Sequence, residues 1–188
     1  GITVKPAPSW NLSIGPNLEK VYDPGQFVQS VDGALMTSTL GRRYVFADIR
    51  QTTLSMETRL NVTFSPALSL QLFAQPFLSG GDFGPLKELK APRTFAFNDY
   101  AESGTVTPTA DGYTVDPDGD GPASAFEAPN LDYNLRSLRG NAVLRWEWRP
   151  GSTVFFAWQQ TREDFQPLVG NFDFNRDRAA LFRAQPDN

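Results

Sequence analysis

The segment from Thr52 to Phe64 alternates apolar and polar side chains almost without interruption. The apolar row consists of Leu54, Met56, Leu60, Val62 and Phe64, and only Thr58 interrupts it. A period of two sends successive side chains to opposite faces of a β-strand. We therefore predict a strand with one face in an apolar medium and the other in water.

Similar alternating segments follow short turns elsewhere in the chain. The turns contain Pro6-Ala7, Pro66-Ala67 and Pro150-Gly151, and proline suits a turn because its φ is preset and it cannot donate to a ladder. Two other stretches, residues 78–137 and 163–188, are predicted to be long loops because they are rich in Gly, Pro, Asp and Asn. The predicted strands are residues 8–22, 43–64, 68–77, 138–149 and 152–162.

Short turns at one end, long loops at the other and strands of about 10–13 residues are typical of outer-membrane β-barrels. Twelve residues tilted by about 45° rise about 28 Å, enough for the hydrocarbon core, whereas strands in globular proteins usually have about 5–6 residues. We predict an all-β fold, a long antiparallel meander of transmembrane-type hairpins over residues 1–188. About five or six strands cannot close, because the smallest outer-membrane barrels have about eight, so the expectation is an incomplete portion of a barrel.

The positions of aromatic and charged residues bear on the same choice. Phe64 and Trp148 precede turn prolines by two residues and Trp10 follows one, which predicts an interfacial aromatic girdle on the short-turn side. Four charged residues of the polar rows are expected to point into the lumen and pair across it: Glu57, Arg59, Arg145 and Glu147. The alternative is a soluble antiparallel sandwich, whose strands also alternate and whose charges face solvent.

The amino-acid composition excludes most common kinds of catalytic site. The chain has no His and no Cys, which excludes a Ser-His-Asp triad, a Cys-His dyad, disulfides and an ordinary structural zinc site. The net charge of −4 has interspersed signs, so nucleic acid is not an expected partner. Carboxylate glycoside hydrolysis remains, with Glu163 and Asp164 as candidates, but nothing in the sequence pairs two acids at the required spacing of about 5–5.5 Å.

One motif in the longer loop matches a calcium-binding loop. Asp116-Pro117-Asp118-Gly119-Asp120-Gly121, with Glu127 six positions later, fits D-x-[DN]-x-[DN]-G-x5-E. The expected ligands at the standard positions are Asp116, Asp118, Asp120, the Pro122 carbonyl, Ser124 through water and Glu127. The flanks are not helical, so the alternative is a solvated turn cluster; bound calcium would serve to order a long exterior loop.

Two further features lie in the predicted loops. Phe95, Phe97 and Tyr100 are predicted to form a local hydrophobic cluster, and the alternative is an exposed aromatic strip that binds sugar. Residues 177–184 are predicted to form a short helix that packs within the loop, because Ala179, Ala180 and Leu181 favour it.

Three stretches carry a resemblance to a known family: Arg43–Asp48, Thr52–Phe64 continuing into Leu68–Phe77, and SLRGNAVLRWEWRPGSTVFFAWQQ at Ser137–Gln160. They resemble the C-terminal barrel region of a bacterial outer-membrane family of unknown function, whose longer members carry an N-terminal domain like carbohydrate-binding family 9. The resemblance implies an outer-membrane location with lipid as a partner. It also implies that the rest of the barrel, or another chain, completes the sheet, since the family's barrels are longer and end in an aromatic residue.

The expected function is a non-enzymatic outer-membrane barrel segment with an anchoring or transport role and a calcium-ordered exterior loop. The second hypothesis is a soluble calcium-dependent sandwich that binds a glycan. A carboxylate glycoside hydrolase is the third.

Overall fold

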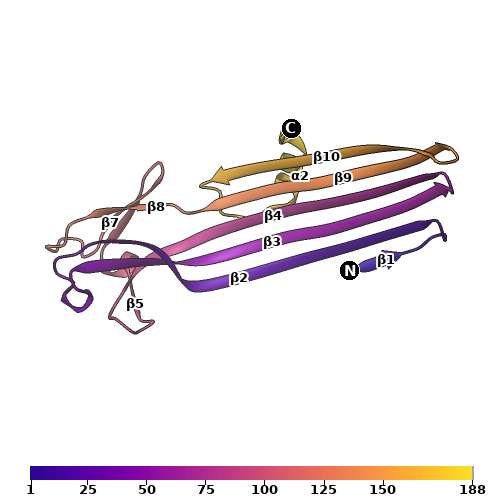
Figure 1. Cartoon of the computed structure of the whole chain (residues 1–188). Coiled ribbons are helices and arrows are strands. Elements are labelled where there is room, and N and C mark those ends of the chain that lie inside the picture. Colours follow the sequence, from indigo (N-terminus) through magenta and orange to yellow (C-terminus); the bar gives the residue numbers. More distant parts are fainter. Residues whose placement is uncertain (188) are drawn as a thin grey trace.

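Five long antiparallel strands dominate the computed structural model, which describes residues 1–187 (Figure 1). They are β2 (Trp10–Asp32), β3 (Arg42–Ser65), β4 (Leu68–Leu89), β9 (Tyr133–Arg149) and β10 (Ser152–Pro167). Each pairs with the next in this order, while β1 (Ile2–Val4) and β11 (Pro186–Asp187) lie on the outer sides of β2 and β10. The short strand β5 (Phe97–Asp99) pairs antiparallel with the last residues of β4. The predicted all-β, antiparallel fold class is confirmed, and the sheet formed by the described residues is open.

The connections differ sharply between the two ends of this sheet. All three predicted proline turns lie at one end, on the right in Figure 1. Gly151 in the last of them has φ +79°, a left-handed conformation that glycine adopts without steric cost. The opposite end carries residues 33–41, with the 3-10 turn η1 (Thr37–Thr39), and the long connection from β4 to β9.

The strands run further toward the long connections than the alternation indicates. β4 ends at Leu89, within residues expected to be loop, because backbone pairing continues through its glycines. Glycine is needed at these positions because other segments lie close to the backbone. A Cβ on Gly80 would lie 2.9 Å from the Gly170 oxygen, and a Cβ on Gly81 would lie 2.3 Å from the Tyr133 ring. β2 likewise continues beyond a register shift between Asp23 and Gln26.

The connection from β4 to β9, predicted as a long loop, is a small folded module. It contains α1 (Tyr100–Ser103) and a three-stranded sheet of β6 (Thr105–Pro108), β7 (Gly112–Asp116) and β8 (Phe126–Pro129). These elements share a buried core with the ends of β3 and β4, formed by Val45, Ala47, Leu86, Tyr100, Val115 and Ala128. Such short elements are stabilised mainly by long-range packing, which local periodicity does not report.

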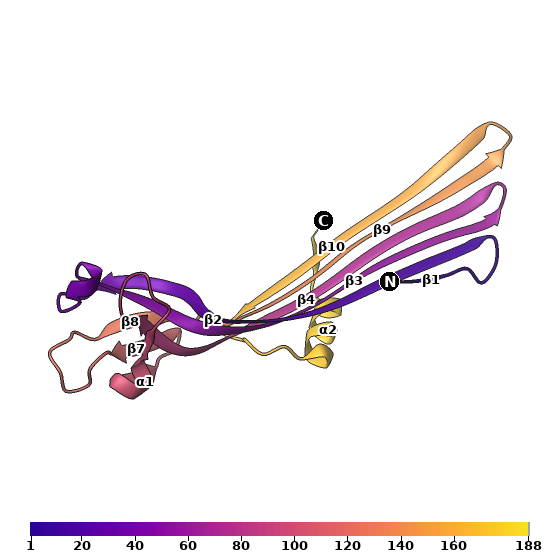
Figure 2. The same cartoon turned by 90° about the horizontal axis from the view of Figure 1, so that it is seen from below.

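A second helix, α2 (Phe174–Arg183), lies against the middle of the main sheet, on the side seen below it in Figure 2. It confirms the helix predicted at residues 177–184 and begins earlier because Asp173 caps it: the Asp173 carboxylate accepts a hydrogen bond of 2.8 Å from the Arg176 amide. Neither helix in the described part of the chain is long and apolar enough to cross a membrane.

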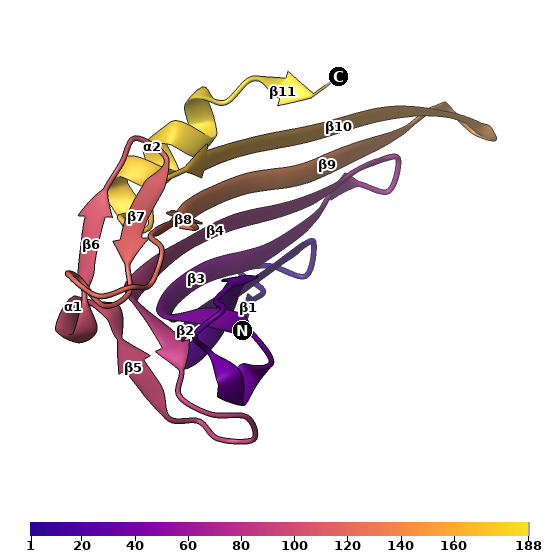
Figure 3. The ribbon, with the colours of Figure 1, turned by 90° about the vertical axis from the view of Figure 1, so that its left-hand side faces the viewer.

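The main sheet is curved when seen from the long-connection end (Figure 3). Strand pairing gives it two chemically distinct faces. One, here called the apolar face, carries two cross-strand rows: Trp10, Val62, Leu70, Leu144 and Phe156, then Leu12, Leu60, Leu72, Ala142 and Trp158. The polar face carries the alternate rows, such as Ser13, Arg59, Phe73, Asn141 and Gln159. The alternation predicted for one strand thus extends across five.

Buried apolar residues are concentrated away from the short turns. Among the described side chains, nine apolar residues are buried, and six of them form the core at the long-connection end. Leu78 and Leu181 are buried at α2, which leaves Val62 as the one buried apolar side chain in the half nearer the short turns. That half of the sheet is a single layer.

Candidate functional site

A buried carboxylate holds α2 against the sheet. Asp177 is fully buried and accepts hydrogen bonds from Arg136 of β9 at 3.1 Å, Asn134 of β9 at 3.1 Å and Arg176 of its own helix at 2.8 Å. Arg136, itself buried, also pairs with Asp164 of β10. Two acids from different segments therefore satisfy one buried guanidinium, the condition under which a buried charge is tolerated.

The electrostatics of Asp177 follow from these contacts. Burial alone would raise the pKa of its carboxyl group, but hydrogen bonds from Arg176, the Asp173 backbone and Asn134 outweigh it and hold the pKa below its ordinary value. Asp177 is therefore ionised at neutral pH.

An apolar groove of about 400 Å³ lies between α2 and the apolar face. Its sheet side is formed by Pro16, Leu54, Met56, Pro76 and Leu78, and its helix side by Phe174, Leu181 and Phe182. Arg178 is the one charged residue in the lining, and its guanidinium carbon lies 5.4 Å from the centroid of the Phe174 ring. The groove can hold an aliphatic group but offers almost no polar partner.

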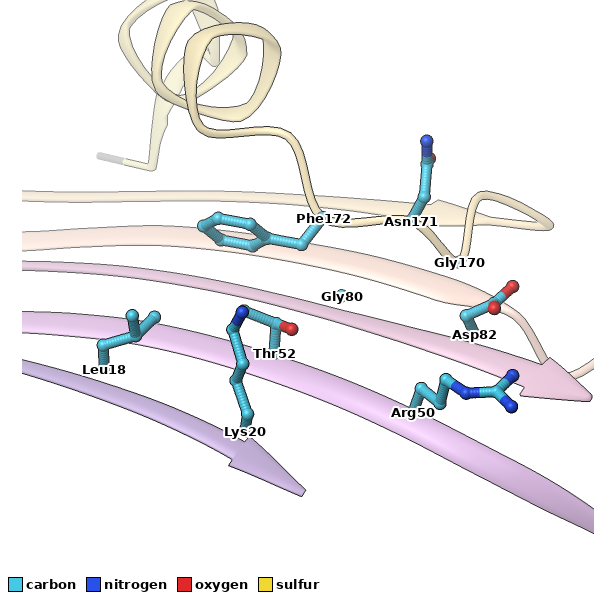
Figure 4. Close-up of a pocket in the computed structure, with 9 residues that line it drawn as sticks. All are labelled: Leu18, Lys20, Arg50, Thr52, Gly80, Asp82, Gly170, Asn171 and Phe172. Atoms are coloured by element: carbon cyan, nitrogen blue, oxygen red, sulfur yellow. The ribbon is translucent and has the colours of Figure 1, made fainter. Parts of the chain in front are cut away.

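A second pocket of about 350 Å³ lies further along the same strands (Figure 4). Lys20 of β2, Arg50 of β3 and Asp82 of β4 supply its charged groups. Gly80 forms its floor, and the segment before α2, Gly170–Phe172, forms its outer wall. Only the absence of a side chain at Gly80 lets that segment approach so closely.

The sequence does not single out this pair of cavities. Their residues come from β2, β3, β4 and the segment around α2, which are far apart along the chain. The one available signal is that Lys20, Arg50 and Asp82 introduce charge into rows that are apolar closer to the short turns.

The predicted calcium ligands are placed in a turn and on two strands. Asp116 ends β7 and accepts hydrogen bonds from the amides of Asp118 and Gly119 at 3.3 and 3.0 Å, while Asp118 accepts one from Ala123 at 3.1 Å. Glu127 lies in β8 and accepts a hydrogen bond of 2.8 Å from Thr114.

Within residues 1–187, no three acidic side chains are grouped so as to hold a metal. Asp120, Pro122 and Ser124 complete the predicted set in the connection between β7 and β8. Asp118 Oδ1 is enclosed and has no hydrogen-bond partner among the described residues, so one acceptor is available in this loop. Calcium binding stays a prediction that solution measurements must decide.

Calcium at 5 mM is expected to stabilise the β6–β8 module by about 1–2 kcal/mol if the loop binds with the millimolar affinity of extracellular sites. The measurement is the thermal midpoint of the protein with calcium and with chelator. Asp118→Ala should abolish the difference, whereas Asp111→Ala, an exposed acid outside the motif, should retain it. An unchanged midpoint and no heat of binding would contradict the calcium prediction.

The four charged residues expected to pair across a lumen pair along their own strands instead. Arg59 contacts Glu57 at 2.7 Å and Arg145 contacts Glu147 at 3.4 Å, each pair separated by two positions on the polar face. The cross-strand neighbours of Arg59 are Ser13 and Phe73, and those of Arg145 are Ser69 and Phe155. None of them is acidic, so each arginine pairs with the acid two positions along its own strand.

The remaining candidates are separated by the fold. Glu163 and Asp164 are adjacent in β10 and therefore face opposite sides of the sheet, and Asp164 is engaged by Arg136. Phe95 is 94% exposed, Phe97 packs on Phe46 with ring centroids 5.2 Å apart, and Tyr100 is fully buried. The aromatic strip is not assembled, and Tyr100 belongs to the local hydrophobic core instead.

No protein-family model, curated protein or solved structure matches this chain. The geometry of the two faces and the two cavities is therefore the basis for the function proposed below.

Proposed function

We propose that this chain is a non-enzymatic segment of a bacterial outer-membrane β-barrel, with an anchoring or transport-related role. The observation that carries the proposal is the single-layer half of the sheet, where the apolar face is exposed. Trp158 is 52% exposed and Phe156 56% exposed there, although both lie in rows of large apolar residues. Such a continuous apolar surface is unfavourable in water and favourable against lipid.

The distribution of aromatic residues supports the same orientation. All four tryptophans lie on the short-turn half of the main sheet, and the register places three of them on the apolar face: Trp10, Trp146 and Trp158. Trp148 is two positions beyond Trp146 in the same strand, the spacing of residues on one face. Aromatic girdles of this kind sit at the membrane–water interface of barrels.

The open edges define the partner that the proposal requires. Only three residues of β2 pair with β1 and only two of β10 pair with β11, so most of both edges has unpaired backbone groups within the described residues. A membrane sheet tolerates no such edge in lipid. The remainder of the barrel, or another chain, would pair with these two strands.

Bilayer insertion can be tested with a pair of single-tryptophan variants. One retains only Trp158, on the apolar face; the other carries Trp158→Phe with Gln159→Trp, its neighbour on the polar face. In vesicles whose acyl chains carry bromine, the fluorescence of Trp158 should be quenched severalfold more than that of the position-159 variant. The two positions are about 3.3 Å apart along the strand, so a severalfold difference reports the face rather than the distance from the surface.

The soluble alternative predicts the opposite behaviour. A sandwich needs a second sheet over the apolar face, and it should then be monomeric without detergent, with equal and weak quenching of both reporters. That result would overturn the membrane proposal and favour a soluble glycan-binding domain.

A further inference from the structure

The apolar groove and the charged pocket are consecutive parts of one surface. Register pairs Leu18 with Leu54, which faces the groove, and pairs Lys20 with Thr52 in the charged pocket. Each step of two residues along a strand advances about 6–7 Å on the same face. An extended molecule lying along β2 and β3 would therefore pass from a largely apolar environment to a cationic one within a few atoms.

The cations of the pocket are available to a ligand. Neither Lys20 nor Arg50 forms an ion pair with any described residue, and both are exposed. The guanidinium carbon of Arg50 lies 5.5 Å from the centroid of the Tyr22 ring, a contact that leaves its charge without an acidic partner. Asp82 is the one acid in the lining, which leaves the pocket with an excess of positive charge. Arg178 at the groove also lacks an ion-pair partner among the described residues.

The groove has the size and lining of a binding site rather than of a packing fault. Its volume of about 400 Å³ is within the usual range for small-molecule sites, about 300–1,000 Å³. Its walls come from two elements that are fixed relative to each other, since Asp177 ties α2 to Arg136 and Asn134 of β9. A flexible aliphatic chain is the chemistry that such walls accommodate.

We propose that these two cavities form one site for an anionic lipid, whose acyl chain lies in the groove under α2 and whose phosphate or carboxylate head lies between Lys20 and Arg50. Charge complementarity selects an anionic head over a neutral one. Each methylene buried in the groove should strengthen binding about fourfold. The proposal deepens the outer-membrane function and rests on it for the source of the lipid, but the site is built entirely from residues of this chain.

The test is a calorimetric titration of the whole chain with dodecyl phosphate, below its aggregation concentration and in a constant nonionic detergent. Saturable binding of one molecule per chain is expected, and the double variant Lys20→Gln/Arg50→Gln should weaken it at least tenfold. The matched control Lys90→Gln/Arg93→Gln removes the same charge from exposed positions outside the site and should bind like the wild type.

Two further probes separate the chain from the head group. Dodecanol should bind at least tenfold more weakly than dodecyl phosphate, and millimolar inorganic phosphate should not displace the lipid. The variant Phe182→Ala shortens one wall of the groove at a position 62% exposed, where little folding stability is lost, and should weaken binding severalfold.

Equal affinity of the Lys20→Gln/Arg50→Gln variant and the wild type, or full competition by inorganic phosphate, would overturn the lipid site. The outcome is distinguishable from failure of the membrane proposal. A chain that is monomeric without detergent and unquenched by brominated vesicles can be titrated in buffer alone, where binding of dodecyl phosphate still decides for or against the site.

Discussion

Replacing Asp177 with Ala is expected to release α2 from the sheet. The change removes the carboxylate that pairs with the buried guanidinium of Arg136 and leaves Asp164 as its one remaining acidic partner. It also removes an acceptor for Asn134 and Arg176. Breaking a buried ion pair by deleting one partner typically costs about 3–5 kcal/mol. A ten-residue helix is too short to be stable without its contacts to the sheet, so it cannot offset this loss.

Hydrogen exchange within residues 173–184 measures this release directly. The Asp177→Ala variant should lose protection in α2 while the amides of β3 and β4 keep theirs, because few contacts of those strands involve the helix. Asp173→Ala is the matched control: it removes the helix cap but no buried charge, and should cost only about 1 kcal/mol. Equal protection of α2 in the wild type and in Asp177→Ala would contradict the assigned anchor.

The same anchor predicts how acid acts on α2. The folded pKa of Asp177 is below its unfolded value, which is about 3.9 for an ordinary Asp, so the folded state disfavours proton uptake. The stabilisation is therefore complete above about pH 4 and is lost as the pH falls through the lower folded pKa. Protection of α2 should decline in that acidic window in the wild type and show no such decline in Asp177→Ala.

Replacing Tyr100 with Ala is expected to unfold the module between β4 and β9. Its ring is fully buried in the core that joins this module to β3 and β4, and it packs on Phe126 with centroids 5.7 Å apart. Loss of a buried aromatic side chain costs about 3–5 kcal/mol. A module of short strands with few other buried residues has little stability to lose.

The hydroxyl group of Tyr100 makes a contribution to stability that is separate from the packing of its ring. Tyr100 lies 3.2 Å from Glu88, which pairs with Arg43, and burial together with the Glu88 charge raises the pKa of the phenol, so it stays neutral and donates. Tyr100→Phe should therefore cost only about 1 kcal/mol, since Glu88 keeps its arginine. Phe95→Ala, at a residue 94% exposed, should leave stability unchanged.

Limited proteolysis of residues 90–132, followed by mass spectrometry, tests the Tyr100 prediction. Cleavage in this region should accelerate at least a hundredfold in Tyr100→Ala, with the hairpins at the short-turn end still resistant. Similar cleavage rates in Tyr100→Ala and Phe95→Ala would show that the core assigned to this module does not stabilise it.

Sequence alone was sufficient for the repeating part of the fold. Alternation in Thr52–Phe64 and the prolines at positions 66 and 150 predicted strands, turns and the chemistry of each face, because a period of two is a local property of extended backbone. Alternation does not predict the strand beyond Leu78. There, glycines without side chains allow other segments to lie against the backbone, and the side-chain pattern no longer indicates whether the backbone is paired.

Tertiary structure alone decided which distant residues meet. Asp177 and Arg136 are joined because α2 folds back onto β9. Lys20, Arg50 and Asp82 line one pocket because strand pairing places Arg50 opposite Asp82 and puts Lys20 in the neighbouring row of the same face. No local propensity encodes such contacts, since their stability depends on burial and charge pairing across the sheet. Alternation along each strand makes one face apolar, and the packing of α2 makes part of that face a groove and leaves the rest exposed.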